Sequence, residues 1–287
     1  MQVLAIDHIH FYIPDLSYWQ NWFWERLGFA VVAQWHYPDR ATLALSHGQL
    51  LIYLSAPYGE SSGVRQFLAE HGAGIGEIGF VCDHPHPPLI CHDIKHLFLD
   101  DRSLSICHTA PERFTAFDHV VLNVPENMLS ATAQWYKDHL NLQEGDRFDI
   151  HTDYSGLTSL VLHNASRTVQ IPINQPTDPN SQVQDFVTHY GGAGIQHVAL
   201  RTHDIETTVT WLRQRGIEFL DTEPSILVEH QTSGRSLHQI FTKPIFTQPT
   251  FFWEIIERRQ GAMGFGAGNF QALFEAIEHQ QRQYVSH

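Results

Sequence analysis

The 287-residue sequence has few cysteines and few cationic side chains. Cys82, Cys91 and Cys107 form no CxxC pair and cannot all be bonded to one another, so neither a structural zinc site nor a disulfide-stabilised secreted scaffold is predicted. Seventeen Lys and Arg stand against thirty-one Asp and Glu, a formal charge of −14. Nucleic acid is therefore excluded as an expected partner, because phosphate binding requires a basic surface.

Long hydrophobic runs are also lacking. No run approaches the roughly 18 uncharged apolar residues of a membrane span, and the start MQVLAIDHIH lacks the basic region and apolar block of a signal peptide. We therefore expect a cytoplasmic protein that does not bind membranes. The 43% hydrophobic content is enough for the core of one large domain or two ordinary ones.

The chain contains one pattern twice. Four segments of the first half return in the same order in the second: AIDHIHFYIP as AFDHVVLNVP, NWFWERLGF as QWYKDHLNL, HGQLLIYLSAP as SRTVQIPINQP, and GAGIGEIGF as GAGIQHVAL. The matching segments lie 111 to 120 residues apart, a spacing typical of a duplicated small domain. We predict an N-terminal domain over 1–110 and a C-terminal domain over 116–287.

Each half begins with an alternating strand that ends at a proline, continues with an amphipathic helix rich in aromatics, and then has several strands, which predicts a βαβββ unit. The Pro-rich stretch 83–93 is interpreted as a loop and 107–115 as the linker. His84 and His86 in that loop could bind a metal, although a His-Pro loop is more often only a turn. A closing helix is predicted after Asn269, its expected N-cap, with Phe270, Leu273, Phe274 and Ile277 on one apolar face.

Three polar residues of the second half occupy inward-facing strand positions. His119, His197 and Glu254 each alternate with apolar neighbours, and a buried carboxylate must be paired or bound to a metal. Two imidazoles and one carboxylate form the facial triad of non-heme Fe(II) oxygenases. Taken alone, each histidine is more often a packing residue, and Glu254 could instead pair with Arg258 or Arg259; periodicity cannot decide whether the three converge.

Other catalytic patterns are missing or weak. The sequence has no GxSxG, HExxH or GxxxxGK[ST] motif, and GFGAGN at 264–269 lacks the context of a dinucleotide site. A Ser-His-Asp set can always be drawn from 21 histidines, so none is singled out.

The second half resembles the 4-hydroxyphenylpyruvate dioxygenase family of the vicinal oxygen chelate superfamily. Its motifs occur in the family's order over about residues 117–283, whereas residues 1–116 share only the pattern. The motifs are FDHVVLNV, WYKDHLNL, PINQP, SQVQDF, GAGIQHVALRTHDI, QIFTKP, FFWEIIERR and GFGAGNFQALFEAIE. The resemblance implies an α+β fold of two tandem vicinal-oxygen-chelate domains, each a pair of βαβββ units forming a half-open barrel-like sheet, plus a C-terminal helix.

The resemblance also implies a site and a reaction. Fe(II) would be held by His119, His197 and Glu254 in the second domain. The substrates would be an aryl-2-oxo acid and O2, with 4-hydroxyphenylpyruvate decarboxylated, hydroxylated on the ring and rearranged to homogentisate and CO2. A homo-oligomer is expected.

Further pocket residues are carried over position by position. The expected catalytic residues are Ser159, Asn174, Gln182 and Gln239, and the expected substrate-binding residues are Gln196, Phe241, Phe265 and Phe270. Neutral amides and a hydroxyl can hold a phenol and a carboxylate without competing for the metal. Strict alternation points Gln196 away from the His197 face, and Phe274 is expected in the core.

Two features depart from the family pattern, a short segment after Leu220 and a compact first domain, and one position differs between the two halves. Only DTEPS separates Leu220 from Ile226, where the family has a much longer segment that helps to wall the pocket. In the first half Glu77 stands where the second has His197, its partner strand carries His8, and RSLSICHTA at 102–110, interpreted as the strand matching FFWEIIER, offers no third carboxylate ligand. Glu77 is therefore expected to pair with a nearby His or Arg.

Three alternatives stay open. 4-Hydroxymandelate synthase has the same fold and substrate but oxidises the benzylic carbon, and it is expected to carry an aliphatic residue where this chain has Phe270. A dioxygenase for another aryl-2-oxo acid would use an altered pocket. A non-catalytic binding homologue would bind iron without turnover.

Overall fold

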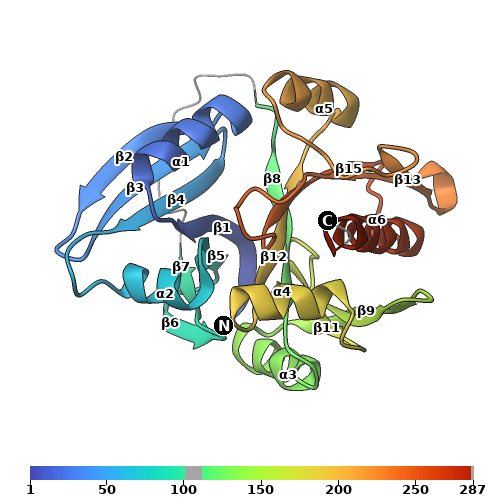
Figure 1. Ribbon diagram of the computed structural model, residues 1–287, viewed down its shortest axis with the longest axis horizontal. Helices are drawn as coiled ribbons and strands as arrows, with labels where there is room; N and C mark the ends of the chain where they lie inside the picture. Colours follow the sequence, from blue (N-terminus) through green and yellow to red (C-terminus); the bar gives the residue numbers. More distant parts are fainter. Residues whose placement is uncertain (101–111, 286–287) are drawn as a thin grey trace.

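The computed structural model describes residues 1–100 and 112–285, with the side chains of the last helix up to His279. Its core is two curled mixed sheets placed side by side, one from each half of the sequence (Figure 1). The first sheet contains β1 (Val3–Tyr12), β2 (Ala30–His36), β3 (Arg40–His47), β4 (Leu50–Pro57), β5 (Gly74–Cys82), β6 (His86–Cys91) and β7 (Ile94–Leu99). With it go α1 (Leu16–Trp22), a π-helical turn η1 (Phe23–Leu27) and α2 (Gly63–His71).

The second sheet has one strand more. Its strands are β8 (Ala116–Asn123), β9 (Gln143–His151), β10 (Gly156–His163), β11 (Gln170–Pro176), β12 (Gly194–Arg201), β13 (Leu227–His230), β14 (Ser236–Phe241) and β15 (Phe252–Arg259). Its helices are α3 (Leu129–Leu140), α4 (Gln182–Tyr190), α5 (Ile205–Gln214), the short 3-10 turn η2 (Thr232–Gly234) and α6 (Ala267–Val285).

The two sheets have the same topology. The first runs β2-β3-β4-β1-β5-β7-β6, and the second, taken from the opposite edge, runs β9-β10-β11-β8-β12-β15-β14-β13. In both, the first strand of the half pairs parallel with the fourth (β1 with β4, β8 with β11) and antiparallel with the strand that carries the GAGI motif (β5, β12). The predicted α+β fold of two tandem half-open sheets with a C-terminal helix is confirmed. In the first sheet β5 leads to β6 and β7 without a helix, whereas α5 follows β12.

The domain bounds 1–110 and 116–287 stay a prediction, because residue 110 and most of the expected linker lie outside the described residues. The segment 102–110, predicted as a strand, lies there too. In the described part of the first sheet, β7 pairs parallel with β5 as β15 does with β12, so β7 occupies the place of β15.

Two local predictions are wrong. Residues 86–91 form the edge strand β6 instead of a loop, which the prolines permit because an edge strand needs hydrogen-bond donors on one side only. The closing helix begins at Ala267, so Asn269 is inside it. The Asn269 amide is not the N-cap but donates to Gln239 Oε1 at 2.8 Å.

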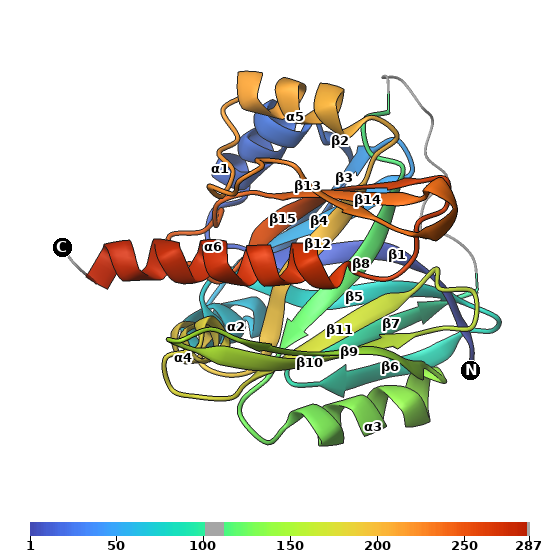
Figure 2. The same ribbon diagram turned by 90° about the vertical axis from the view of Figure 1, so that its right-hand side faces the viewer.

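Aromatic side chains join the two sheets. Phe11 of β1 contacts Phe251 and Trp253 of the second half, with ring centroids 5.2 and 5.8 Å apart, and all three rings are buried. On the other side of the second sheet, α6 lies across the strands (Figure 2). Its residues Leu273 and Phe274 are buried as predicted, so the helix covers the face that would otherwise be open.

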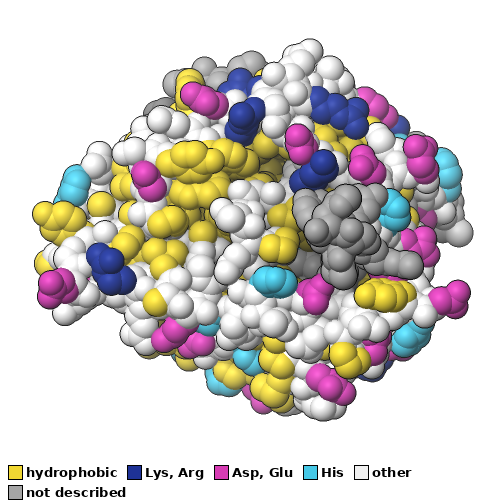
Figure 3. All heavy atoms as spheres, viewed as in Figure 1, with side chains coloured by type: hydrophobic (Ala, Val, Ile, Leu, Met, Phe, Trp, Pro, Cys, Tyr) yellow, Lys and Arg dark blue, Asp and Glu magenta, His cyan; other side chains and the backbone are white. Residues whose placement is uncertain are grey.

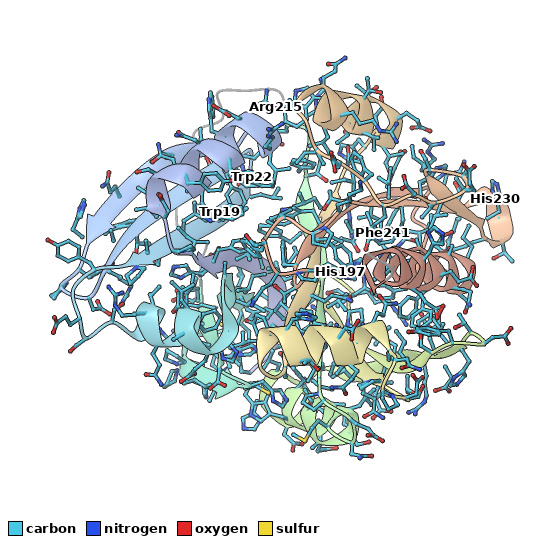
Figure 4. All side chains as sticks on the ribbon, viewed as in Figure 1. Trp19, Trp22, His197, Arg215, His230 and Phe241 are labelled. Carbon is cyan, nitrogen blue, oxygen red and sulfur yellow. The ribbon has the colours of Figure 1, made fainter. Side chains whose placement is uncertain are left out.

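Hydrophobic side chains also gather on the surface near α1 (Figure 3). Tyr18 of α1 and Trp24 of η1 are 59% and 56% exposed. Trp22 lies between them in the sequence and beside Trp19 in Figure 4. Among the described helices, none is both long enough and apolar enough to span a membrane.

Candidate metal centre

The three predicted metal ligands converge on one face of the second sheet. His119 on β8 and Glu254 on β15 are both in register with Ala199 on β12, and His197 lies two residues before Ala199 on the same face. The small Ala199 side chain leaves space between them. Glu254 Oε2 lies 3.0 Å from His119 Nε2 and 3.4 Å from His197 Nε2, and the three ligand atoms are all within 4.8 Å of one another.

Each histidine is held from behind by an oxygen. His119 Nδ1 lies 2.9 Å from Asp118 Oδ1, and His197 Nδ1 lies 3.1 Å from Gln196 Oε1. An Nδ1–H that donates to these oxygens leaves the Nε2 lone pair of each ring facing the centre, as a metal ligand requires. The other oxygen of Glu254 accepts a hydrogen bond from Gln239 Nε2 at 2.8 Å.

Asp118 is itself held by two arginines. Arg258 donates from Nε and Nη2 at 2.8 and 2.7 Å, and Arg201 donates from Nε at 2.8 Å. Burial opposes ionisation, but the Arg258 guanidinium and these hydrogen bonds keep the pKa of Asp118 well below its usual range. The carboxylate behind His119 is therefore ionised at neutral pH.

The charges of the cluster are strongly coupled. Burial of Glu254 favours its neutral form, yet the two imidazoles lower its pKa to about 2. Burial also disfavours charged His119, but the Glu254 and Asp118 carboxylates raise its pKa to about 9, while burial lowers the pKa of His197. Without a metal, a proton on His119 thus compensates Glu254. Within the described residues, this is the one group of three His, Cys, Asp or Glu close enough to share an ion.

A small cavity of about 30 Å³ opens at the cluster. Besides the three ligands it is lined by Val121, Phe148, Ser159, Val161, Pro172, Asn174, Gln239, Phe241, Phe265, Phe270 and Leu273, which include six of the predicted pocket residues. Ser159 Oγ and Asn174 Oδ1 are buried without a hydrogen-bond partner, so a bound ligand could bond to both. Phe265 contacts the His119 ring edge to face at 4.7 Å, and Phe241 lies 6.2 Å from the His197 ring (Figure 4).

Two predicted residues lie elsewhere. Gln182 and Gln196 line a neighbouring groove of about 630 Å³ that also includes Leu220, next to the short segment 221–225, and Phe252. Gln196 points away from the cavity, as alternation predicts, and its side chain contacts His197. Gln182 Oε1 is buried without a partner. Substrate contact by these two glutamines stays a prediction.

Sequence reasoning missed four residues. Asp118 and Asn269 support His119 and Gln239, Phe148 lines the cavity, and Asn123 accepts a hydrogen bond from Asn174 at 3.1 Å. One signal was available for Asp118, because the dipeptide Asp-His occurs in the matching strand of both halves.

The first sheet carries a changed copy of this arrangement. His8 and Glu77 take the places of His119 and His197, and Leu97, in register with Gly79, takes that of Glu254. Glu77 Oε1 lies 3.0 Å from His10 Nδ1, and Glu77 Oε2 lies 3.1 Å from the ammonium of the strand neighbour Lys95. The expected pairing of Glu77 with a nearby histidine is confirmed, with a lysine as its cationic partner.

Comparison with known proteins agrees with this fold. The profile of the Glyoxalase/Bleomycin resistance protein/Dioxygenase superfamily matches residues 116–233. An uncharacterized protein of Synechocystis sp. is 31% identical, with 98% of this chain and 99% of that protein covered. 4-Hydroxyphenylpyruvate dioxygenase of Caenorhabditis elegans is 30% identical, with 97% and 92% covered. The latter alignment spans 363 positions against 287 residues here, so the nematode protein contains residues that this chain lacks.

A solved structure has the same fold. A variant of 4-hydroxymandelate synthase from Streptomyces coelicolor superposes with a TM-score of 0.88 at 23% identity, covering 98% of this chain and 100% of that one. The nematode relative is similar over nearly its whole length. The chain therefore belongs to the 4-hydroxyphenylpyruvate dioxygenase family and is a dioxygenase of the vicinal oxygen chelate superfamily.

Proposed function

We propose that the protein is an Fe(II)-dependent dioxygenase that converts 4-hydroxyphenylpyruvate and O2 to homogentisate and CO2. The observation that carries this proposal is the buried cluster of His119, His197 and Glu254 at the inner end of an aromatic cavity. The relatives from Caenorhabditis elegans and Tetrahymena thermophila, both named 4-hydroxyphenylpyruvate dioxygenase, support the choice of substrate.

The donor atoms fit a ferrous ion. Two imidazole nitrogens and one carboxylate oxygen are the ligands typical of non-heme Fe(II) oxygenases, and both rings have the Nε2 atom directed at the carboxylate. Iron held there would supply the Lewis acidity and the redox chemistry that O2 activation requires. Because His119 carries a proton in the metal-free protein, metal binding must release that proton and should weaken as the pH falls.

The cavity walls suit an aryl-2-oxo acid. Phe265 and Phe270 offer ring contacts, and Ser159 and Asn174 offer hydrogen bonds to polar substituents. None of the described residues that line the cavity is Lys or Arg. The negative charge of the substrate carboxylate therefore has to be met at the cluster, which orients the acid end of the molecule inward and its ring toward the phenylalanines.

Gln239 is the best supported of the predicted catalytic residues. Its amide donates to Glu254 Oε1 and accepts from Asn269, both at 2.8 Å, so its position is fixed by a ligand on one side and by α6 on the other. This arrangement keeps a neutral dipole beside the reacting atoms without adding a ligand.

The groove beside segment 221–225 favours a second candidate, the dioxygenation of another aryl-2-oxo acid. Leu220, Gln182 and Gln196 line this open groove next to the cavity, so a substrate longer than 4-hydroxyphenylpyruvate could extend into it. 4-Hydroxymandelate formation and metal binding without turnover remain outcomes of the test below.

The test is a product assay. Protein loaded anaerobically with Fe(II) is mixed with O2 and 4-hydroxyphenylpyruvate, and the products are separated by chromatography. Homogentisate is expected. 4-Hydroxymandelate as the sole product would refute the proposed reaction, and iron binding without O2 consumption, with any aryl-2-oxo acid, would identify a binding homologue.

His197→Ala tests the ligand assignment. We expect this variant to lose iron binding and turnover while its circular dichroism stays that of the wild type, because the backbone pairing of β12 does not depend on the His197 side chain. Near-normal activity would mean that the metal ligands are misassigned. The homo-oligomer and the cytoplasmic location stay predictions, and size-exclusion chromatography with light scattering addresses the first.

A further inference from the structure

A second pocket lies next to Asp118 and shares no residue with the metal cavity. Its volume is about 370 Å³. Its lining is formed by Ser166, Arg167, Thr168, Gln170, Arg201, Thr202, His203, Glu257, Arg258, Gly261, Ala262, Met263 and Gly264. Three of these thirteen residues are arginines, in a chain that has only seventeen Lys and Arg and a formal charge of −14.

The positive charge of this pocket exceeds its negative charge. Arg201 and Arg258 share the single carboxylate of Asp118, and no hydrogen bond or ion pair joins the guanidinium of Arg167 to another described residue. The one carboxylate in the lining, Glu257, already pairs with Arg259 at 2.8 Å. An anion in the pocket would therefore meet cations whose charge is not fully compensated.

The cationic wall is also rigid. The Arg258 side chain is 9% exposed and donates to both oxygens of Asp118 and to the backbone oxygens of Ala262 and Gly264. Arg201 is held by Asp118 but remains 37% exposed. Arg201 uses Nε and Nη2 on Asp118, so its Nη1 group is left for contacts with phosphate or carboxylate oxygens, which guanidiniums bind well.

A buried amide in the lining lacks a partner. Gln170 is 2% exposed, and its Oε1 has no hydrogen-bond partner. A buried polar atom without a partner indicates a missing ligand or an amide that can turn. Because rotation by half a turn exchanges the oxygen and nitrogen of the amide, Gln170 can present an N–H to an anion next to the arginines.

We propose that this pocket binds a small oxyanion, either phosphate or the carboxylate of an organic acid. Arg167 and Arg201 supply the charge, Gln170 supplies a neutral donor, and Arg258 fixes the wall. This inference does not depend on the proposed reaction, because the pocket contains none of the metal ligands.

The experiment is calorimetric titration of the full chain with inorganic phosphate and, separately, with acetate, at constant ionic strength set by chloride. Titrations are run on protein as purified and after dialysis against a chelator, so that phosphate binding at a metal is recognised. Saturable binding of one oxyanion per chain, retained after chelation, is expected. Tighter binding of phosphate than of acetate would identify a phosphate as the ligand, and the reverse would identify the carboxylate of an organic acid.

Arg167→Ala is expected to weaken the binding at least tenfold and Gln170→Leu severalfold. Arg147→Ala removes an arginine that is 57% exposed on β9 and lies outside the pocket, so it is the charge-matched control and should bind as the wild type does. Absence of saturable binding by either acid, or equal weakening by Arg147→Ala and Arg167→Ala, would overturn the proposal.

Discussion

Replacing Asp118 by asparagine should weaken both the fold and the metal centre. Asp118 is 1% exposed and neutralises two guanidiniums. Removing one member of a buried ion pair costs about 3–5 kcal/mol. Arg201 can turn toward solvent and the asparagine oxygen can still accept one hydrogen bond, so the loss should be near the lower limit, about 3 kcal/mol.

The same change should also lower the metal affinity, because Asp118 supports His119. Its Nδ1–H would lose a charged acceptor at 2.9 Å, and an amide that turns its NH2 group to the ring would oppose the required tautomer. Loss of such a supporting partner typically lowers metal affinity by roughly 10–100-fold, which corresponds to about 1.4–2.7 kcal/mol. Stability is measured by urea unfolding of the metal-free protein, and affinity by competition with a coloured chelator for Co(II) and Fe(II).

The sequence itself provides the matched control. Asp7 holds His8 at 2.7 Å in the first sheet, so Asp7→Asn makes the same chemical change at the equivalent strand position, away from His197 and Glu254. It should leave metal affinity unchanged. A folded Asp118→Asn variant with metal affinity within about twofold of the wild type would refute the reasoning, as would equal losses in both variants.

Three further predictions concern titration, the first sheet and the product. Burial lowers the pKa of His96 to about 4. The neutral form of His96 therefore stabilises the fold fully above the unfolded pKa of about 6.5, and this contribution is lost as the pH falls toward 4. Between pH 7 and 5 the free energy of unfolding should decrease by about 2 kcal/mol. His96→Gln, which can keep a bond to Tyr136, should show a correspondingly flatter pH dependence in urea unfolding, and an unchanged slope would contradict the assigned pKa. Glu77→Gln should lower the unfolding free energy at pH 7 by about 1–3 kcal/mol, because Glu77 accepts from His10 and Lys95. The metal content of the protein, measured by elemental analysis, should stay the same. A metal content that falls by half would show that the first sheet also binds a metal. Phe270→Leu opens the cavity wall and should shift the chromatographic product ratio toward 4-hydroxymandelate, whereas an unchanged ratio would show that this ring does not direct the site of oxidation.

The inward positions of His119, His197 and Glu254 were predictable because strand alternation places each on an apolar face. Their convergence was not predictable from periodicity, because it depends on how the strands pair, and the expectation that they bind one metal came from the family resemblance. The apolar face of α6 followed from its helical spacing: one short-range periodicity determines which residues are buried.

Strand alternation could not place Asp118, because the position of its side chain depends on irregular backbone. In β8 the pairing with β12 passes from His119 to Phe117 and skips Asp118, and in β1 the pairing with β5 skips Asp7 in the same way. Such a bulge re-aims a side chain that simple alternation would place differently. It also explains why Arg258, considered a partner for Glu254, binds Asp118 instead.

The first sheet is consequently a starting point for a designed second centre in the same chain. It already has the bulge, the Asp7–His8 pair and the register of the ligand strands, and Gly79 leaves space for the His8 ring, which a Cβ at that position would strike. The first sheet differs from the second in the ligand set at positions 77 and 97. Glu77→His combined with Leu97→Glu would therefore place two histidines and one glutamate at strand positions equivalent to those of His119, His197 and Glu254. Comparing the metal affinity of this doubly substituted first sheet with that of the cluster in the second sheet would show how much of the affinity the three ligands alone determine.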